Sequence, residues 1–498
     1  MSVLVVVDRA EDWPLDIPGV EVVPARRYLT DPAFSGRRGA KVFNLCRRYR
    51  YQSLGYYVSL LAQARGHRPL PSVATIRDLR HRSLVRLISE DLEELISRSL
   101  DPLTGNEFTL SIYFARNVAK RHQRLSRALF NLFPAPLLRA TFVRKEEEWE
   151  LQNIRPIAAR EIPEHHHEFV IEAAREYFAG RTRISKPPQP ARYDLAILVN
   201  PEEDEPPSDE RAIRRFVRAA DEVGFEVEVI EPDDIGRLAE FDALFIRETT
   251  AVEHHTYRFS RRAEAEGLVV IDDPDSIVRC SNKVYLAEAL TRAKIPTPRT
   301  EILHRDNVEE VAAAIGFPCI LKRPDSSFSQ GVVRIEDIDR FRVTTEDFLE
   351  QSELLIVQEF LPTDFDWRVG VLDRRVLYAA RYMMARDHWQ IIKRGRGGNV
   401  SYGRAQAVAL EEVPGVVLET ALAAANLMGD GFYGVDVKER DGKPYVIEVN
   451  DNPSVEAGYE DTVAGDQLYL DFMKVMMERV EKRRRGLEAN SAREGKRR

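Results

Sequence analysis

Two short segments near the C-terminus carry acidic and amide side chains in a pattern that few folds use. Residues 434–437 and 446–450 are rich in β-branched side chains, and the Asp-Gly turn between them predicts that they pair as a hairpin. Glu448 and Asn450 stand two residues apart, so they point to the same face of the second strand. Once the strands pair, we expect these two side chains to converge with Asp436.

This set of ligands favours a magnesium site. Two carboxylates and an amide oxygen, with no His or Cys nearby, are hard oxygen donors of the kind that Mg²⁺ prefers, with Mn²⁺ as an alternative. Magnesium that has only a few protein ligands usually shares its shell with nucleotide phosphates. An exposed hairpin with acidic residues on its solvent face would give the same pattern, so the preceding sequence has to decide between the two.

Two lysines upstream suit the phosphates of such a nucleotide. Lys283 opens an amphipathic helix that ends before Pro296, and Lys322 ends a buried-type strand over 318–322. A loop of small polar residues follows, and then another strand begins near Val332. Two lysines on separate elements, a small-residue loop and a metal-binding hairpin could hold a triphosphate from both sides.

Further strands complete the pattern. Residues 355–361 form an apolar strand that ends in a polar pair, and residues 364–371 start another strand with charges at its mouth. At this point the chain resembles the ATP-grasp superfamily and, within it, the RimK-like carboxylate–amine ligases. The matching segments, in the family's order, are 281–283, 320–322, the loop to Gly331, 357–360, 366–368, 398–400, 434–436 and 448–450.

The resemblance implies a role for each of several residues. Those expected to bind ATP are Lys283 and Lys322 at the phosphates, Gln358, Glu359, Phe360 and Leu361 at the adenine edge, and Asp366 at the ribose. Those expected at the transferred phosphoryl group are Arg368, Arg381 and Asn399, and the expected metal ligands are Asp436, Glu448 and Asn450. The chain departs from the family in that Arg396 stands one residue further from Asn399 than usual, so Arg394 or Lys393 is an alternative.

The same resemblance implies an α/β architecture. We expect an ATP-grasp clamp of two α+β subdomains over residues 281–480, preceded by a small parallel α/β domain over 193–280 and followed by a flexible basic tail over 481–498. The Pro-rich stretch before Ala191 predicts a linker, because such a stretch cannot sustain a helix. Residues 1–185 then form a separate N-terminal α/β domain of the kind attached to some RimK-like proteins.

The alternation of strand, helix and strand after the linker indicates a parallel sheet covered by helices. We expect strands at 193–199, 225–230 and 242–247, with a helix over 209–223. Arg247 ends the last of these strands, where open α/β sheets bind ligands. It is a candidate for a substrate carboxylate, and a surface ion pair is the alternative.

The implied activity is the ATP-dependent joining of a carboxylate to an amine. Transfer of the γ-phosphoryl group to the carboxylate gives an acyl phosphate, which an amine attacks to form an amide, with ADP and phosphate as by-products. Phosphoryl transfer needs positioning and charge neutralisation, which lysines, arginines and magnesium provide. The expected reaction adds glutamate or another amino acid to an acidic peptide, a protein terminus or an amino acid. A small-molecule dipeptide-type ligase and a non-catalytic nucleotide-binding regulatory protein are the alternatives.

Charge and composition bear on the partners. The chain has 73 Lys and Arg against 81 Asp and Glu, whereas residues 1–150 have 24 against 17. A basic N-terminal region could contact an acidic polypeptide or RNA, although a solvated basic surface explains the charge equally well and nucleic acid is not expected. Three cysteines without paired spacing indicate neither disulfides nor a zinc site. Without a leader or a long apolar run, we expect a cytoplasmic protein with no membrane segment. We also expect a homo-oligomer.

Overall fold

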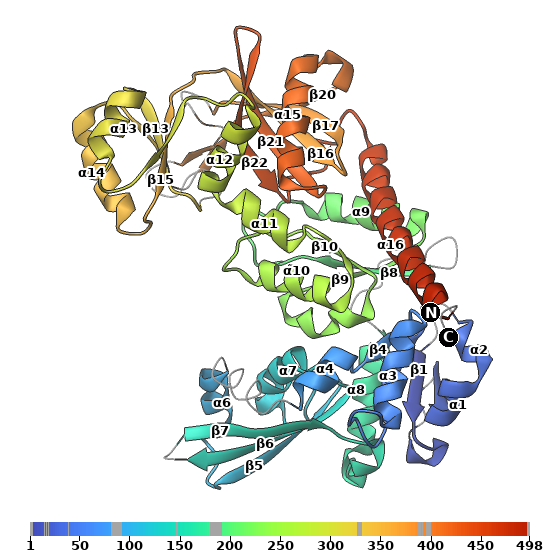
Figure 1. Ribbon diagram of the computed structural model, residues 1–498. Coiled ribbons are helices and arrows are strands. Elements are labelled where there is room, and N and C mark those ends of the chain that lie inside the picture. The colour runs from blue at the N-terminus through green and yellow to red at the C-terminus, as the bar shows by residue number, and fades with distance from the viewer. Residues whose placement is uncertain are drawn as a thin grey trace.

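The computed structural model describes residues 3–495 except positions 14, 16, 18 and 38 and the segments 81–91, 146–147, 180–191, 326–330, 386–389, 391 and 395–399. The elements form an open arc. Residues 3–179 lie at one end of the arc, which is called the N-terminal end below. A small parallel sheet lies in the middle, and two antiparallel sheets lie at the other end (Figure 1). This arrangement confirms the α/β fold class expected from the sequence. The predicted linker falls on residues outside those described.

The N-terminal end contains a parallel sheet in the order β2-β1-β3-β4 and an antiparallel sheet in the order β5-β6-β7. Its strands are β1 (Val3–Val7), β2 (Val20–Pro24), β3 (Lys41–Asn44), β4 (Arg68–Leu70), β5 (Glu107–Tyr113), β6 (Leu137–Lys145) and β7 (Glu148–Pro156). Its helices are α1 (Ala25–Thr30), α2 (Pro32–Ser35), α3 (Leu54–Ala64), α4 (Val73–Asp78), α6 (Glu93–Leu100), α7 (Gln123–Leu132) and α8 (His167–Ala179).

The middle of the arc is a parallel sheet in the order β11-β10-β8-β9, as the alternation of elements predicts. Its elements are β8 (Tyr193–Leu198), α9 (Glu210–Val223), β9 (Phe225–Ile230), β10 (Ala243–Ile246), α10 (His255–Glu266), β11 (Val269–Ile271) and α11 (Pro274–Ser281). Local chemistry sets the bounds of α9. The Asp209 side chain accepts a hydrogen bond from the Ala212 amide at 3.0 Å, and Gly224 ends the helix at a φ of 102°.

The clamp consists of two antiparallel sheets, β12-β15-β13-β14 and β20-β17-β16-β21-β22. The first is built from α12 (Lys283–Ala293), β12 (Thr300–Leu303), α13 (Val308–Ile315), β13 (Cys319–Lys322), β14 (Val332–Ile335), α14 (Ile338–Leu349) and β15 (Leu355–Glu359). The second is built from β16 (Phe365–Leu372), β17 (Arg375–Met383), β20 (Ala405–Val408), α15 (Gly415–Met428), β21 (Phe432–Arg440) and β22 (Lys443–Asp451), and a small ribbon pairs β18 (Ile392–Arg394) with β19 (Val400–Tyr402).

The last helix, α16 (Asp466–Gly495), joins the middle sheet to the clamp (Figure 1). Phe472 lies on it, and its ring centre is 5.4 Å from that of Phe216 in α9 and 5.2 Å from that of Phe432 in β21. The middle sheet and the clamp therefore share one hydrophobic core. The large clusters at the N-terminal end, in contrast, are built from residues 3–178.

The contact between the N-terminal end and the middle sheet is polar. Asp242 accepts hydrogen bonds from Arg68 and from Arg484, the latter at 2.7 Å, and Lys41 lies 3.6 Å from a carboxylate oxygen of Glu240. Arg484 belongs to the segment expected to be a flexible tail, but the structure continues α16 through residues 481–495. Its arginines have partners on two layers, which explains why the helix extends beyond the expected boundary. None of the helices within the described residues is long and apolar enough to cross a membrane.

Candidate active site

A pocket with about 830 Å³ of empty space, part of which is open solvent, lies between the two sheets of the clamp. The lining residues come from both sheets and from α12, and they are Lys283, Pro298, Ile320, Lys322, Val332, Gln358, Glu359, Phe360, Leu361, Asp366, Gln390, Asp436, Lys438, Ile447 and Glu448. All seven residues expected to bind ATP are among them, together with two of the three expected metal ligands.

Strand register brings the acidic residues together. In the second clamp sheet, Arg368 of β16 pairs with Asp436 of β21, and Asp436 pairs with Glu448 of β22. Residues that stand opposite each other in antiparallel strands point to the same face. The pocket face therefore presents a row of charges, while the other face packs apolar side chains under α15.

The expected metal ligands are held by hydrogen bonds and ion pairs. Arg368 binds Asp436 with both nitrogens, at 2.6 Å and 3.1 Å, and Asn450 donates from its Nδ2 to Asp436 Oδ2 at 3.3 Å. Lys283 Nζ lies 2.8 Å from Glu448 Oε1. Two carboxylates and an amide on paired strands fit a hard divalent cation, because an amide oxygen can replace the amide nitrogen after a simple flip.

Burial and charge act differently on the two carboxyl groups. Burial raises the pKa of Asp436 to about 6, and the neighbouring Arg368 only partly opposes this. Burial also raises the pKa of Glu448, but Lys283 and Lys322 outweigh it, so the pKa of Glu448 lies below its ordinary value. Glu448 is therefore ionised throughout the physiological range.

Lys322 is buried at the end of β13, with 7% of its surface exposed. Its Nζ donates to Gln358 Oε1 at 2.5 Å. Burial lowers the pKa of Lys322 to about 8, and Lys283 and Lys438 add to this effect while Glu448 opposes it. A buried ammonium group with one neutral acceptor nearby is a strong site for an anion.

Sequence reasoning missed several residues of the pocket. Lys438 stands two residues after Asp436, and its Nζ lies 2.6 Å from Asp366 Oδ1 and 2.7 Å from the Thr363 hydroxyl. The alternation of side chains along a strand could have identified Lys438. Ile447 lines the pocket because an irregularity in the pairing of β21 with β22 accommodates one extra residue there, which no local pattern indicates.

The structure separates Arg381 from the site. Arg381 pairs with Trp367, so it lies on the face opposite to Arg368, and its guanidinium stacks 4.8 Å from the Trp367 ring centre and 5.1 Å from that of Phe365. The reason is a β-bulge between Gly370 and Val371, which shifts the register of β17 by one residue. The expected contact of Arg381 with the phosphoryl group therefore does not fit this structure.

Two further expectations have other outcomes. Asn399 and Arg396 lie outside the described residues, and Lys393 and Arg394 belong to β18. Arg247 has neither of its expected roles, because it is buried and donates to Asn452 Oδ1 at 2.5 Å and to the Pro453 carbonyl at 3.0 Å. It thus fastens the middle sheet to the segment that follows β22.

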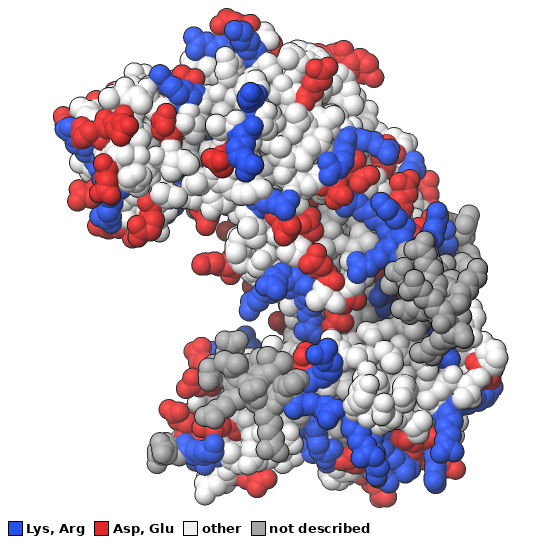
Figure 2. Space-filling view, in the orientation of Figure 1, with Lys and Arg blue, Asp and Glu red and all other residues white. Residues whose placement is uncertain are grey.

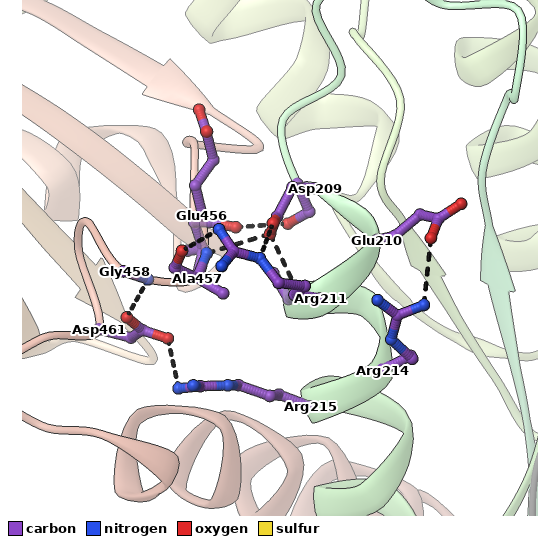
Figure 3. Close-up of polar contacts among 12 residues, drawn as sticks. Asp209, Glu210, Arg211, Arg214, Arg215, Glu456, Ala457, Gly458 and Asp461 are labelled. Atoms are coloured by element: carbon purple, nitrogen blue, oxygen red, sulfur yellow. Dashed lines mark hydrogen bonds and ion pairs between the residues drawn. The ribbon is translucent and has the colours of Figure 1, made fainter.

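Helix α9 holds the next part of that segment (Figure 3). Arg211 donates to the Ala457 carbonyl at 2.9 Å, and Asp209 accepts from the Ala457 amide at 3.0 Å. One turn further along, Arg215 binds Asp461 at 2.7 Å. The middle sheet therefore positions the chain that follows the β21–β22 hairpin.

Comparisons with known proteins identify the family of this chain. Residues 280–466 match the RimK-like ATP-grasp domain, and residues 25–173 match the RimK-like ATP-grasp N-terminal domain. A probable alpha-L-glutamate ligase of Vibrio vulnificus is 29% identical over 223 residues, which are 44% of this chain and 71% of that protein. An alpha-aminoadipate–LysW ligase, LysX, of Saccharolobus solfataricus is 28% identical over 208 residues, which are 40% of this chain and 70% of that protein.

Among solved structures, a D-alanine–D-alanine ligase of Bacillus anthracis covers 60% of this chain and 99% of its own, with 17% identity and a TM-score of 0.47. The match of residues 280–466 makes the chain an ATP-grasp ligase. With both family matches, the chain belongs to the RimK-like ATP-grasp ligases.

Proposed function

We propose that the clamp pocket binds ATP with its phosphates toward β22. Lys283 and Lys322 then contact the phosphates, and the end of β15 with Phe360 and Leu361 presents the adenine edge. Apolar side chains from both sheets support this orientation, since Ile320 and Val332 line one wall and Ile447 lines the other. The Asp366–Lys438 pair lies at the pocket wall and is suited to the ribose hydroxyls.

We place the magnesium ion, or manganese in its stead, at Asp436, Glu448 and Asn450. Bound there, the ion would neutralise charge on the transferred phosphoryl group. The single observation that carries the proposal is that each carboxylate expected to bind the metal forms an ion pair with a basic residue expected to contact the phosphates. Lys283 pairs with Glu448, and Arg368 pairs with Asp436. Entry of a metal–nucleotide complex gives all four charged groups a new partner of opposite sign.

The reaction follows from this arrangement. A carboxylate oxygen of one substrate attacks the γ-phosphorus, the bond to the β-phosphate oxygen breaks, and ADP leaves. The amine of the second substrate then attacks the acyl carbon, phosphate leaves with the bonding electron pair, and the amine loses a proton. Arg368 lies beside Asp436 and would hold the transferred phosphoryl group through both steps.

The proposed substrates are a carboxylate-bearing peptide, protein terminus or amino acid and the amine of glutamate or a related amino acid. The names of the relatives, a glutamate ligase and a ligase for α-aminoadipate, support an acidic amino acid as one partner. Basic residues support an acidic acceptor. Figure 2 shows Lys and Arg, interspersed with Asp and Glu, along the visible inner wall of the hollow between the two ends of the arc, and α10, with exposed Arg258 and Arg261, borders this hollow in Figure 1.

The test is ATP turnover by the full-length protein with single amino acids and with pools of acidic peptides, followed by mass spectrometry. We expect ADP, phosphate and a product one amino-acid residue heavier. Asp436→Asn and Glu448→Gln should keep the fold and lower the rate about a hundredfold or more, because losing metal stabilisation costs several kcal/mol. AMP as the product, or unaffected rates in both variants at limiting magnesium, would contradict the proposal.

A further inference from the structure

A second cluster of ligand-type side chains lies outside the pocket, in the loop between β10 and α10. Glu248, His254 and His255 each bring one ligand atom to within 4.8 Å of the others. Glu248 follows Arg247 at the end of the strand, and the two histidines start the helix. The nucleotide site described above uses none of these residues.

Glu248 is the buried member of the cluster. Its side chain is 1% exposed, and its Oε2 lies 2.5 Å from His255 Nε2. Its other oxygen, Oε1, is buried and has no hydrogen-bond partner among the described residues. A buried carboxylate oxygen without a partner is costly, so the site is suited to a further positive group.

The histidines are placed to supply that positive group with ligands. The two rings lie 3.9 Å apart between centres, and His254 Nδ1 lies 3.1 Å from the Thr256 hydroxyl. This contact orients the ring and leaves Nε2 as its ligand atom, in the way that outer partners orient metal-binding histidines. Both histidines are only partly buried, so an ion can reach them from solvent.

We propose that Glu248, His254 and His255 bind a zinc-type transition metal ion. Two imidazoles and one carboxylate are the donor set of three-ligand zinc sites, with an open fourth position, and they differ from the all-oxygen set expected for magnesium. At metal–ligand distances of about 2.0–2.2 Å, tetrahedral ligand atoms stand roughly 3.4 Å apart, so small side-chain rotations close the site.

Glu203 contacts the same loop. Its Oε1 accepts from the Thr249 amide at 3.0 Å, and its Oε2 is buried with no partner in the described part of the chain. Burial, with a smaller contribution from the charge of Glu248, raises the pKa of Glu203. A cation beside these carboxyl groups would relieve their repulsion.

The loop between β10 and α10 would connect the bound ion to the β21–β22 hairpin. Asn452 donates from its side chain to the Glu248 carbonyl, and the Thr250 hydroxyl donates to Asp451 at 2.6 Å. These contacts lie one and two residues beyond Asn450. An ion on Glu248 and the histidines would therefore stabilise the contact between the middle sheet and the clamp.

The test is titration of the chelator-treated full-length protein with Co²⁺ and with Zn²⁺, in excess magnesium to occupy the nucleotide site. We expect one Co²⁺ per chain with the visible absorption of a low-symmetry nitrogen–oxygen site, and displacement by Zn²⁺. His254→Ala and Glu248→Gln should each weaken binding at least tenfold. Zn²⁺ should raise the unfolding temperature of the unaltered protein and not that of the variants.

The matched control is the double variant of His165 and His166, changed to alanine. These are also adjacent histidines with ring centres 4.4 Å apart, but among the described residues they do not belong to a group of three possible metal ligands. This variant and Asp436→Asn should bind Co²⁺ normally, so failure of the nucleotide site leaves the result intact. Absence of stoichiometric binding, or equal binding in folded His254→Ala and Glu248→Gln variants, would overturn the proposal.

Discussion

At the scale of single residues, most charged side chains of the pocket form ion pairs with one another. Lys283 with Glu448, Arg368 with Asp436 and Lys438 with Asp366 are ion pairs of 2.6 to 2.8 Å. Buried ion pairs contribute little net stability, because desolvation offsets their attraction. They do keep each side chain in place before a ligand arrives, which reduces the cost of ordering the site on binding.

Lys322 is the exception, because its partner Gln358 is neutral. Its pKa falls from 10.5 to about 8 through burial, so between these values the unfolded chain holds a proton that the folded chain lacks. Stability from this group therefore rises with pH across that window, and at neutral pH the buried ammonium costs about 3 kcal/mol. Replacing Lys322 should remove this pH dependence.

We expect Lys322→Met to weaken ATP binding and to gain stability relative to the unaltered protein at pH 7. This gain should shrink as the pH approaches 10, because the lysine then loses its charge on folding. Urea unfolding of both proteins at the two pH values measures the difference. A stability difference that does not change with pH would show that Lys322 is charged and solvated in the folded state.

Arg368 and Arg381 offer a matched pair on neighbouring strands. Arg368→Lys keeps the charge but cannot bind Asp436 with two parallel hydrogen bonds, so we expect kcat to fall at least tenfold. Arg381→Lys should leave kcat within about threefold and cost at most about 1 kcal/mol of stability, because it alters only stacking on Phe365 and Trp367. Equal losses of kcat would place both arginines in the site.

At the scale of elements, close packing of β21 against its neighbours holds Arg368 in place. A Cβ atom on Gly434 would lie 2.7 Å from Pro453 Cβ and 3.0 Å from Arg368 Nη1. The proline follows the hairpin and is held by Arg247, so it cannot move away easily. The lack of a side chain at Gly434 is therefore a condition for the position of the guanidinium.

Gly434→Ala should consequently lower kcat more than it lowers ATP affinity, because the displaced group is the arginine proposed to hold the transferred phosphoryl group. Gly415→Ala is the control, since it lies at the start of α15 with nothing within 4 Å of the added Cβ. Steady-state kinetics with thermal unfolding of both variants separates the two effects. A Gly434→Ala enzyme with an unchanged kcat would mean that the sheet adjusts without moving Arg368.

At the scale of the whole molecule, the chain divides into two units with separate cores. The middle sheet and the clamp share a core through α16, whereas the N-terminal end meets them through Arg68, Arg484, Asp242 and Glu240. Removing one side of a polar contact exposes little apolar surface. We therefore propose that residues 1–185 position the acceptor. The homo-oligomer expected from the sequence stays a prediction.

A protein that starts near Pro190 should stay soluble and bind ATP within about threefold of the full-length affinity, but lose ligation of its acceptor. Calorimetry and the turnover assay measure the two properties. Ligation by the full-length protein should also weaken with salt, because charges attract the acidic acceptor over distances of about 10 Å at 0.1 M salt. Insolubility of the shortened chain, or loss of its ATP binding, would mean that the N-terminal end is needed for the fold.

The sequence by itself determined the elements and most of the site. Asp209 and Gly224 bound α9 as their chemistry predicts, and alternation along β22 places Glu448 and Asn450 on one face. These features depend on neighbours within a few residues, so a local pattern carries them. The order of the family's segments supplied the nucleotide residues, and all seven of them line the pocket.

Only the tertiary structure decided which residues of different strands stand opposite each other. The bulge between Gly370 and Val371 is the clearest case, since without it Arg381 would oppose Asp366 on the pocket face. A shift of one residue in register moves every later side chain of β17 to the other face. The burial of Arg247 and the pairing of Lys283 with Glu448 are likewise contacts between distant segments. Such contacts depend on how whole layers pack, which no short stretch of sequence specifies.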